Sequence, residues 1–258
     1  MKKETEEKLA CSLTAETTEL LPFLPYLLQD LWELGSSPKE MVGLIEKHLP
    51  VSQETRILDL ACGKGAVSIN IAASLNVSVC GVDLMPEFIE CANQKAKELK
   101  VDSLCRFLCG DANEAVNTER NYDGVIFGGA GNILGSPQET LSKLLKTVKP
   151  GGYLLMDEAY LPDGSGSEEI KFKYEYLTRE QWMRLFEDNG LRLVEELPST
   201  EGYDFDSDNK AIALRADELI AKHPEKRAIF EGYVRSQLNE CEDLENNVAA
   251  VTWMLQRL

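Results

Sequence analysis

The sequence predicts an α/β fold, in which a doubly wound, mostly parallel sheet of seven strands is covered by helices on both faces. Three observations predict it. The length of 258 residues suits one large domain with a sizeable core. Hydrophobic residues make up 43% and charged residues 28%, which is ordinary for a globular protein. Short apolar segments alternate with helical patterns over about 100 residues, as in consecutive βαβ units.

The first 50 residues are predicted to form an N-terminal helical cap. Residues 1–15 are highly charged, and we expect them to be frayed. Two helical patterns follow, at about 16–33 and 37–48. The second pattern begins with Ser37-Pro38, a capping residue followed by proline at the first helical position.

Residues 51–160 are predicted to form the core of the domain, with strands and helices in alternation. The expected strands are 55–60, 76–82, 105–109, 122–127 and 153–156, and the expected helices are 67–75, 86–99 and 138–148. Lys149-Pro-Gly-Gly152 is expected to be a turn before the fifth strand. Right-handed crossovers then place helices on both faces of the sheet.

Residues 161–258 complete the same domain with a different pattern. A connection rich in Gly, Ser and charged residues spans 161–176, and Thr178 opens a helix that ends at Asn189-Gly190. Alternating residues 191–197 predict a strand. The charged segment 207–241 predicts two helices broken at His223-Pro224, and the apolar, β-rich segment 248–255 predicts a last strand, so a helical insertion at about 198–247 precedes it.

Charge and hydropathy exclude several classes of partner. The 27 basic and 44 acidic residues give a net charge of −17, which repels nucleic-acid backbones and anionic membranes. The longest apolar run is residues 20–28, which contains two prolines and falls well short of the roughly 20 residues that span a bilayer. Glutamates follow Met1-Lys2-Lys3 where a signal peptide would become apolar. We therefore expect a soluble cytoplasmic protein that binds neither nucleic acid nor membrane.

Cysteine and histidine usage points the same way. The seven cysteines are scattered without a Cys-x-x-Cys pair, which is typical of reduced cytosolic thiols. The only histidines are His48 and His223. This number disfavours both a histidine-based metal site and a His-centred catalytic triad, so no metal is predicted.

Three features carry chemistry, and each has a simpler structural explanation. Asp59-Leu-Ala-Cys-Gly-Lys-Gly65 follows the first strand, where glycines let a backbone approach a ligand and a helix N-terminus attracts negative charge; such a turn also occurs without a ligand. Asp83 follows the second strand and suits the two hydroxyls of a ribose, or it caps the next helix. Asp111 follows the third strand and suits an adenine amino group flanked by apolar side chains, or it is also a cap.

Together, these features describe a nucleoside pocket at consecutive strand ends. With the Lys149-Pro-Gly-Gly152 turn, the chain resembles the class I S-adenosylmethionine-dependent methyltransferases of the small-molecule type over about residues 30–160. The resemblance implies a Rossmann-like fold with S-adenosyl-L-methionine as cofactor. It also implies a set of cofactor-binding residues: Trp32, Asp59, Ala61, Cys62, Gly63, Gly65, Asp83, Leu84, Asp111, Ala112 and Gly128.

Within this resemblance each residue has an expected role. The Gly-rich turn holds the methionine portion, with Asp59 ordering the turn. Asp83 holds the ribose, Asp111 holds the adenine amino group, and Leu84 packs on the ring. Trp32 lies in a segment that in related enzymes folds over the cofactor, although a core tryptophan is the plainer interpretation.

The acceptor side is less defined. Phe127-Gly-Gly-Ala-Gly-Asn132 lacks the Asn/Asp-Pro-Pro-aromatic motif of enzymes that methylate nucleobases or glutamine. Its glycines are expected to leave space for a bulky small molecule, and Asn132 is either a substrate contact or a turn residue. Glu158 and Tyr160 are the candidates for general base. The alternative is that Glu158 is only a carboxylate at a strand end and that Tyr160 only packs against its neighbours.

The insertion before the last strand is expected to cover the substrate. Tyr203, Phe205 and Phe230 are pocket candidates there, and Tyr233 and Arg235 are the substrate-binding candidates; helical spacing also fits ordinary packing. The charged helices suit either a solvated face or the contact of a homodimer.

The sequence therefore predicts methyl transfer from S-adenosylmethionine to a small-molecule nucleophile. Because the sulfonium donor is already activated, the reaction is an in-line displacement that needs alignment and exclusion of water rather than a triad. Two alternatives stay open. One is an NAD-dependent oxidoreductase, whose glycine fingerprint would need Gly or Ala at Ser68. The other is a non-catalytic protein that binds S-adenosylmethionine.

Overall fold

The structure is a computed structural model that describes residues 3–162, 170–171, 174, 176–198 and 205–258. Tyr203, one of the pocket candidates, lies outside these residues. The chain forms two compact units. The first contains residues 1–31, 159–179 and 198–251, and the second contains residues 32–158, 180–197 and 252–258. The expected division into 1–50, 51–160 and 161–258 stays a prediction.

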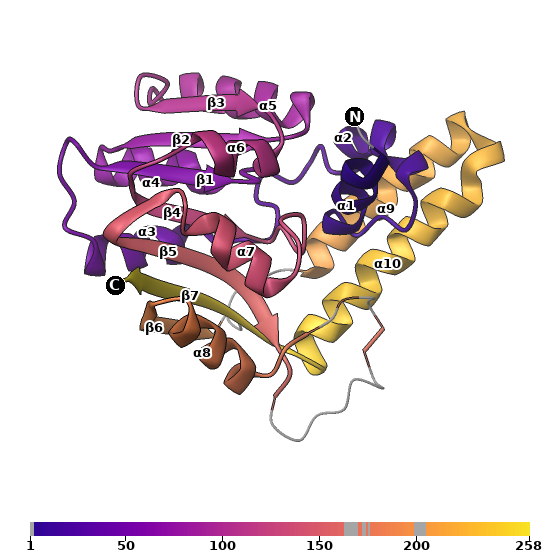
Figure 1. Cartoon of the computed structure of the whole chain (residues 1–258). Coiled ribbons are helices and arrows are strands. Elements are labelled where there is room, and N and C mark those ends of the chain that lie inside the picture. Colours follow the sequence, from indigo (N-terminus) through magenta and orange to yellow (C-terminus); the bar gives the residue numbers. More distant parts are fainter. Residues whose placement is uncertain (1–2, 163–169, 172–173, 175, 199–204) are drawn as a thin grey trace. The chain divides into compact units, whose positions relative to one another are not determined.

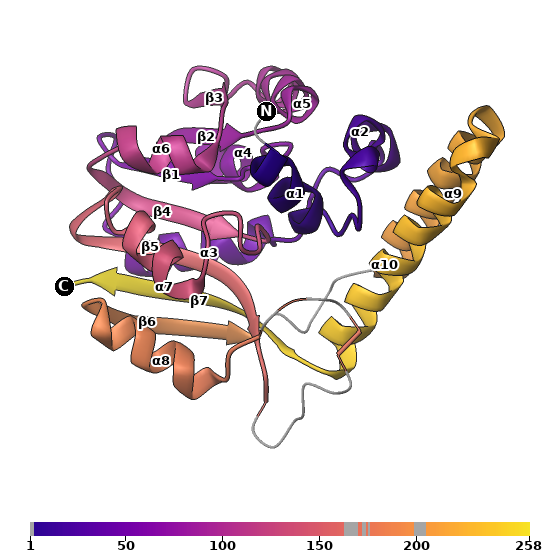
Figure 2. The same cartoon turned by 45° about the vertical axis from the view of Figure 1, so that its right-hand side comes forward.

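The second unit is built on a seven-stranded sheet, as the sequence predicts (Figure 1). Its strands are β1 Arg56–Leu60, β2 Ser78–Asp83, β3 Cys105–Cys109, β4 Tyr122–Gly128, β5 Val148–Tyr160, β6 Leu191–Pro198 and β7 Ala249–Arg257. They lie in the order β3-β2-β1-β4-β5-β7-β6, and the pairs among the first five strands are all parallel. β7 runs opposite to β6 (Figure 2). The mostly parallel, Rossmann-like sheet is thus confirmed.

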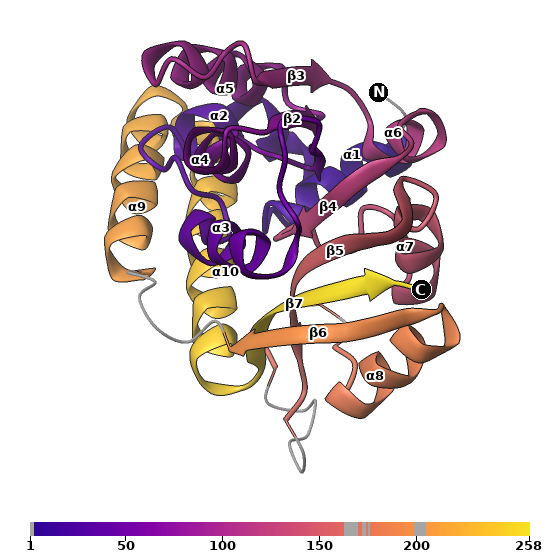
Figure 3. The ribbon, with the colours of Figure 1, turned by 90° about the vertical axis from the view of Figure 1, so that its left-hand side faces the viewer.

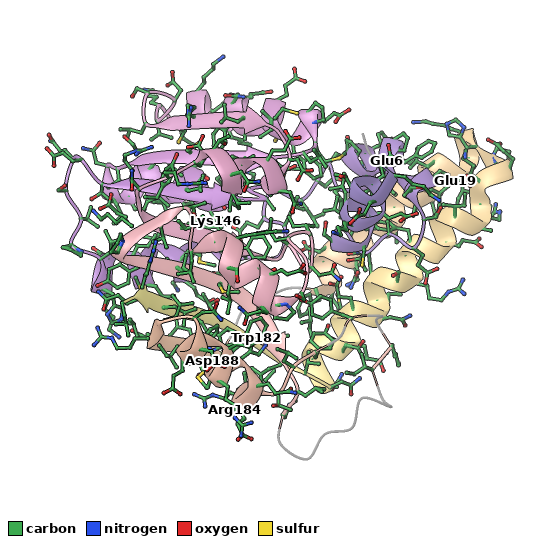
Figure 4. All side chains as sticks on the ribbon, viewed as in Figure 1. Glu6, Glu19, Lys146, Trp182, Arg184 and Asp188 are labelled. Carbon is green, nitrogen blue, oxygen red and sulfur yellow. The ribbon has the colours of Figure 1, made fainter. Side chains whose placement is uncertain are left out.

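Helices cover both faces of this sheet (Figure 3). One face carries α3 Pro38–His48, α4 Ala66–Leu75 and α5 Pro86–Glu98, and the other carries α6 Ala112–Thr118, α7 Pro137–Leu144 and α8 Arg179–Asp188. Figure 4 shows the amphipathic pattern on α8, where Trp182 points toward the sheet and Arg184 away from it. Trp182 is 2% exposed and packs against Trp253 of β7. Burial of such apolar faces is the main force that holds the layers together.

The first unit is mainly helical. It contains α1 Lys3–Ser12, the 3-10 helix η1 Thr18–Phe23, α2 Leu24–Leu27, α9 Phe205–Lys222, the 3-10 helix η3 Pro224–Lys226 and α10 Arg227–Asn246. Phe23 packs edge-on against Phe230 with ring centroids 5.1 Å apart, which ties η1 to α10. The Tyr26 hydroxyl donates a hydrogen bond to Glu218, which joins α2 to α9.

Three local predictions were wrong. Residues 3–12 are a helix rather than frayed chain, because Leu9 and Ala10 are buried. The helix expected at 16–33 is broken into η1 and α2, since Pro22 and Pro25 cannot donate the hydrogen bonds of a continuous helix. Lys149-Pro-Gly-Gly152 is an irregularity inside β5, whose pairing with β4 shifts between Tyr122 and Gly124.

No helix in the part of the chain that the structure describes has the length and apolar character needed to span a membrane.

Candidate active site

The turn after β1 lies where the strand order reverses, between β1 and β4, which is the usual ligand site of open α/β sheets. Its backbone is left-handed at Ala61 (φ 61°), Gly63 (φ 52°) and Gly65 (φ 75°). A non-glycine residue in this conformation is uncommon and tends to occur at functional sites. The Cys62 amide donates to the Val82 carbonyl over 3.1 Å, which joins the turn to β2. α4 begins directly after Gly65, so its N-terminus adjoins the turn.

Asp83, the last residue of β2, orders this turn. Its Oδ2 accepts a hydrogen bond from the Gly63 amide over 2.8 Å, and its Oδ1 accepts one from the Met85 amide over 2.9 Å. The side chain is buried, and this burial raises the pKa of the carboxyl. A carboxylate has about four acceptor positions, so both oxygens retain the capacity to accept from a ligand. Asp83 therefore holds the turn and the start of α5 while keeping free acceptor positions.

Asp59 lies under the turn, 4% exposed, at the end of β1. The Ser68 hydroxyl of α4 donates to its Oδ2 over 2.6 Å. Burial raises the pKa of Asp59 to about 7, the Ser68 hydrogen bond opposes that shift, and the charge of Asp83 adds to it. The charge of Asp83 thus disfavours ionisation of the buried Asp59 carboxyl, and a cationic ligand would relieve this repulsion.

Asp111 lies at the end of the neighbouring strand. The β2–β3 register pairs Asp83 with Cys109, so Asp83 and Asp111 share the carboxyl edge of the sheet. Asp111 Oδ1 accepts from the Asn113 amide over 2.8 Å, which makes it the cap of α6. Its Oδ2 makes no hydrogen bond within the described parts of the chain. Beside these carboxyls Leu84 is half-buried, and Ala112 is buried in the first turn of α6.

The segment of residues 32–36, here called the N-terminal strap, lies against the turn. The Trp32 indole donates to the Lys64 carbonyl over 3.2 Å. A Cβ on Gly63 would lie 3.3 Å from Leu34 Cδ1. Trp32 also packs against the main apolar core, as the plainer interpretation expects, and its place over the cofactor stays a prediction.

The glycines of this region are required by protein packing. A Cβ on Gly65 would lie 2.9 Å from both Ala92 Cβ and Phe107 Cζ. A Cβ on Gly128 would overlap Ser36 Oγ and lie 2.9 Å from Asp157 Cβ. The expectation that the glycines after β4 leave space for a bulky molecule is therefore wrong on this side of Gly128, because the strap fills that space.

The acceptor-side candidates lie in different places. Asn132 is exposed in a turn, where its carbonyl accepts from the Gly135 amide over 2.9 Å. Glu158 is half-buried near the end of β5, and Tyr160 ends that strand within the first unit. Tyr233 and Arg235 also belong to the first unit, where the Tyr233 ring is buried and Arg235 is exposed.

Phe205 and Phe230 lie on α9 and α10 of the first unit. Phe230 is fully buried and packs against Phe23, so ordinary packing explains it. Phe205 begins α9 and is half-buried.

Sequence reasoning missed four residues of the site. Leu34 and Ser36 belong to the strap, and Asp157 lies beside it. Lys64 is a buried lysine within the turn, 5% exposed, with its ammonium 5.7 Å from the centre of the Phe88 ring. For Asp157 a signal was present, since it directly precedes Glu158 at a strand end. Across the described ranges, no group of three or more His, Cys, Asp or Glu side chains is arranged to hold a metal ion.

Comparison with known proteins identifies the family. A family model described as a methyltransferase domain matches residues 51–190, more than half of the chain. The chain belongs to this methyltransferase family. The membership confirms the resemblance drawn from the turn and the strand-end carboxylates, and it makes the protein a methyltransferase.

Individual relatives agree with this. The chain is 28% identical to the uncharacterized protein YjhP of Escherichia coli (strain K12) over 208 residues, 78% of this chain and 82% of YjhP. It is 33% identical over 105 residues to a malonyl-[acyl-carrier protein] O-methyltransferase of Priestia megaterium, which covers 40% of this chain and 36% of that methyltransferase. No comparison supports the oxidoreductase or the non-catalytic alternative.

A solved structure confirms the fold. A SAM-dependent methyltransferase of Geobacter sulfurreducens, in complex with S-adenosyl-L-homocysteine, superposes with a TM-score of 0.76 at 20% identity, covering 92% of this chain and 98% of that one.

Proposed function

We propose that this methyltransferase takes its methyl group from S-adenosylmethionine and transfers it to a small-molecule nucleophile. One observation carries the proposal: Asp83 binds the backbone of the glycine turn at the point where the strand order reverses. A carboxylate held at this position, with spare acceptor capacity, suits the paired hydroxyls of a ribose.

The residues at the carboxyl edge fit an adenosyl cofactor. Asp83 would accept from the ribose hydroxyls, and Asp111 Oδ2 would accept from the adenine amino group, with Leu84 and Ala112 flanking the ring. Ala61, Cys62 and Gly63 would hold the methionine portion, because they form a left-handed turn beside a helix N-terminus. Four further residues would support the turn without binding the cofactor directly. Asp59 would do so through its hydrogen bond with Ser68, and Gly65 by its close packing against α5 and β3. Trp32 would act through its hydrogen bond to the Lys64 carbonyl, and Gly128 by leaving room for the strap.

Charge supports a cationic cofactor. Asp59 and Asp83 are buried close enough that the charge of Asp83 raises the pKa of Asp59. When bound, S-adenosylmethionine supplies a methyl group activated by a positively charged sulfur. The chain's own contribution is then to hold the two reactants in line and to exclude water, which together lower the barrier of a displacement without a covalent intermediate on the protein.

Glu158 would serve as general base where the acceptor carries a proton at neutral pH, with Tyr160 as the second candidate. Asn132, Tyr233 and Arg235 are proposed acceptor contacts. A small molecule is favoured by the net charge of −17, which disfavours nucleic acid, and by the glycines that replace the nucleobase-type motif after β4.

The proposal places the enzyme in the cytoplasm. All seven cysteines are free thiols in the structure, which suits a reducing compartment. The charged helices α9 and α10 would serve as a solvated face or as the contact of a homodimer.

Isothermal titration of the protein with S-adenosylhomocysteine and, separately, with NAD tests the cofactor. We expect one binding site per chain for S-adenosylhomocysteine and none for NAD; binding of NAD alone would contradict the proposal. A metabolite panel that follows release of S-adenosylhomocysteine then tests catalysis, and silence across broad panels would favour a protein that only binds the cofactor.

A further inference from the structure

Asp157 lies at the carboxyl end of β5, beside the N-terminal strap rather than in the glycine turn. We propose that Asp157 is a positioning residue for the cofactor: by holding Ser36 it keeps the strap of residues 32–36 against the turn of residues 61–65. The inference rests on the proposed function, because the turn is the proposed cofactor site. It assigns Asp157 a role through the strap and no contact with the reacting atoms.

Three elements pack around the Asp157 carboxyl. The Thr252 hydroxyl of β7 donates to its Oδ1 over 2.7 Å. The Ser36 hydroxyl, in a side chain only 6% exposed, makes no hydrogen bond within the described residues, but it lies beside the Asp157 side chain over Gly128 and lowers the pKa of that carboxyl. Glu40, in the first turn of α3, lies near enough for the charge of Asp157 to raise its pKa. Burial raises the pKa of Asp157, and the two hydroxyls oppose that shift.

Gly128 makes the contact between Ser36 and Asp157 sterically feasible. In the β4–β5 register Gly128 pairs with Asp157. A Cβ at Gly128 would overlap Ser36 Oγ, lie 2.9 Å from Asp157 Cβ and lie 3.4 Å from Met41 Cε. The hydroxyl and the carboxyl therefore share a space that any side chain at Gly128 would occupy.

The other contacts of the strap lead to the cofactor turn. Trp32 binds the Lys64 carbonyl, and Leu34 packs over the Cα of Gly63. Gly35 lies close to Gly129, because a Cβ added at Gly35 would lie 3.3 Å from the Gly129 Cα. The strap is thus hydrogen-bonded to the turn at its first residue, and its last residue packs beside Asp157. Loss of the contact between Ser36 and Asp157 would release the middle of the strap. Leu34, in this middle part, packs on Gly63, whose amide donates to Asp83.

This arrangement predicts a specific pattern of mutational effects on S-adenosylhomocysteine affinity, measured by titration calorimetry. Ser36→Ala and Asp157→Ala are each expected to weaken binding by at least about fivefold, the lower end of the range for losing the partner of a buried polar group. The double variant should lose no more than either single one, because the two groups act through one contact. Asp157→Asn should retain affinity within about threefold, since its amide oxygen still accepts from hydroxyl groups.

Acrylamide quenching of tryptophan fluorescence reports on the strap without any cofactor. Trp182 and Trp253 are buried at 2% and 0% exposure, whereas Trp32 is half-buried, so added quenching reports mainly on Trp32. Asp157→Ala should increase the quenched fraction, and Asp157→Asn should not. Glu195→Gln is the matched control: Glu195 binds Lys47 and His48 at the far end of α3, so its loss should change neither readout.

The outcomes separate the two proposals. If the unaltered protein fails to bind S-adenosylhomocysteine, the proposed function fails, and quenching alone decides the role of Asp157. Unchanged affinity and unchanged quenching in Asp157→Ala would overturn the positioning role, as would additive effects in the double variant. Should Asp157→Ala fail to fold, Ser36→Ala and Gly128→Ala test the same contact and are expected to weaken binding in the same range.

Discussion

Substitution of Gly65 by alanine tests whether the cofactor turn is shaped by packing as well as by backbone conformation. Gly65 has a φ of 75° and would place a Cβ 2.9 Å from both Ala92 Cβ and Phe107 Cζ. The left-handed conformation costs a residue with a side chain about 1–2 kcal/mol. Overpacking of a tight site costs about 1–3 kcal/mol more. The free energy of unfolding should therefore fall by about 2–5 kcal/mol.

Gly151 provides a matched control. It has the same φ of 75°, and a Cβ there would have nothing within 4 Å. Gly151→Ala should show only the conformational cost, about 1–2 kcal/mol. The difference between the two variants isolates the packing cost at Gly65.

Thermal unfolding of both variants measures this difference. At about 2–4 °C per kcal/mol for a protein of this size, Gly65→Ala should melt about 2–12 °C below Gly151→Ala. Equal melting temperatures would refute the argument that Ala92 and Phe107 require glycine at position 65.

Three further predictions concern neighbouring groups. Burial raises the pKa of Asp59 from an ordinary 3.8 to about 7, so the folded state binds this proton more tightly and stability falls as pH rises between these values. Asp59→Asn should therefore raise Tm more at pH 8 than at pH 5; an equal change at both would contradict it. Asn113 donates to the Ile133 carbonyl over 3.0 Å and accepts from Lys143 over 2.9 Å, so Asn113→Ala should speed hydrogen exchange in residues 130–135. Asp111→Ala should weaken S-adenosylhomocysteine binding by about 5- to 150-fold, the range for a lost hydrogen bond to a carboxylate; unchanged affinity would remove it from the adenine site.

The sequence predicts the sheet and the cofactor turn because their signals are local. Apolar segments, a Gly-rich turn and carboxylates directly after strands repeat at short spacing, and parallel strands bring their carboxyl ends to one edge. Asp83 and Asp111 are therefore placed correctly at that edge from sequence alone. Asp111 caps α6 through one oxygen, and its other oxygen makes no hydrogen bond within the described residues, so the cap leaves the proposed adenine contact possible.

The resemblance predicts that the segment around Trp32 folds over the cofactor, but the contacts of this strap could not be predicted, because they join residues far apart in sequence. Gly128 is visible in the sequence, but whether a ligand or the protein fills the space beside it depends on the path of Ser36. Asp157 was overlooked in favour of Glu158. Alternate residues of a strand face opposite sides of the sheet, and only the packing of α3 and β7 shows that Asp157 lies on the side of the strap.

The most direct test of the central claim is the affinity of S-adenosylhomocysteine for Asp83→Ala, measured by titration calorimetry beside the unaltered protein. The account predicts a loss of about 5- to 150-fold, the equivalent of 1–3 kcal/mol for hydrogen bonds to a carboxylate. Asp123→Ala is the control, because Asp123 binds the Arg56 amide and Lys149 at the amino end of β4, away from the turn. Its affinity should match that of the unaltered protein. Equal affinity in Asp83→Ala and Asp123→Ala would contradict the claim that the carboxyl edge of the sheet holds the cofactor.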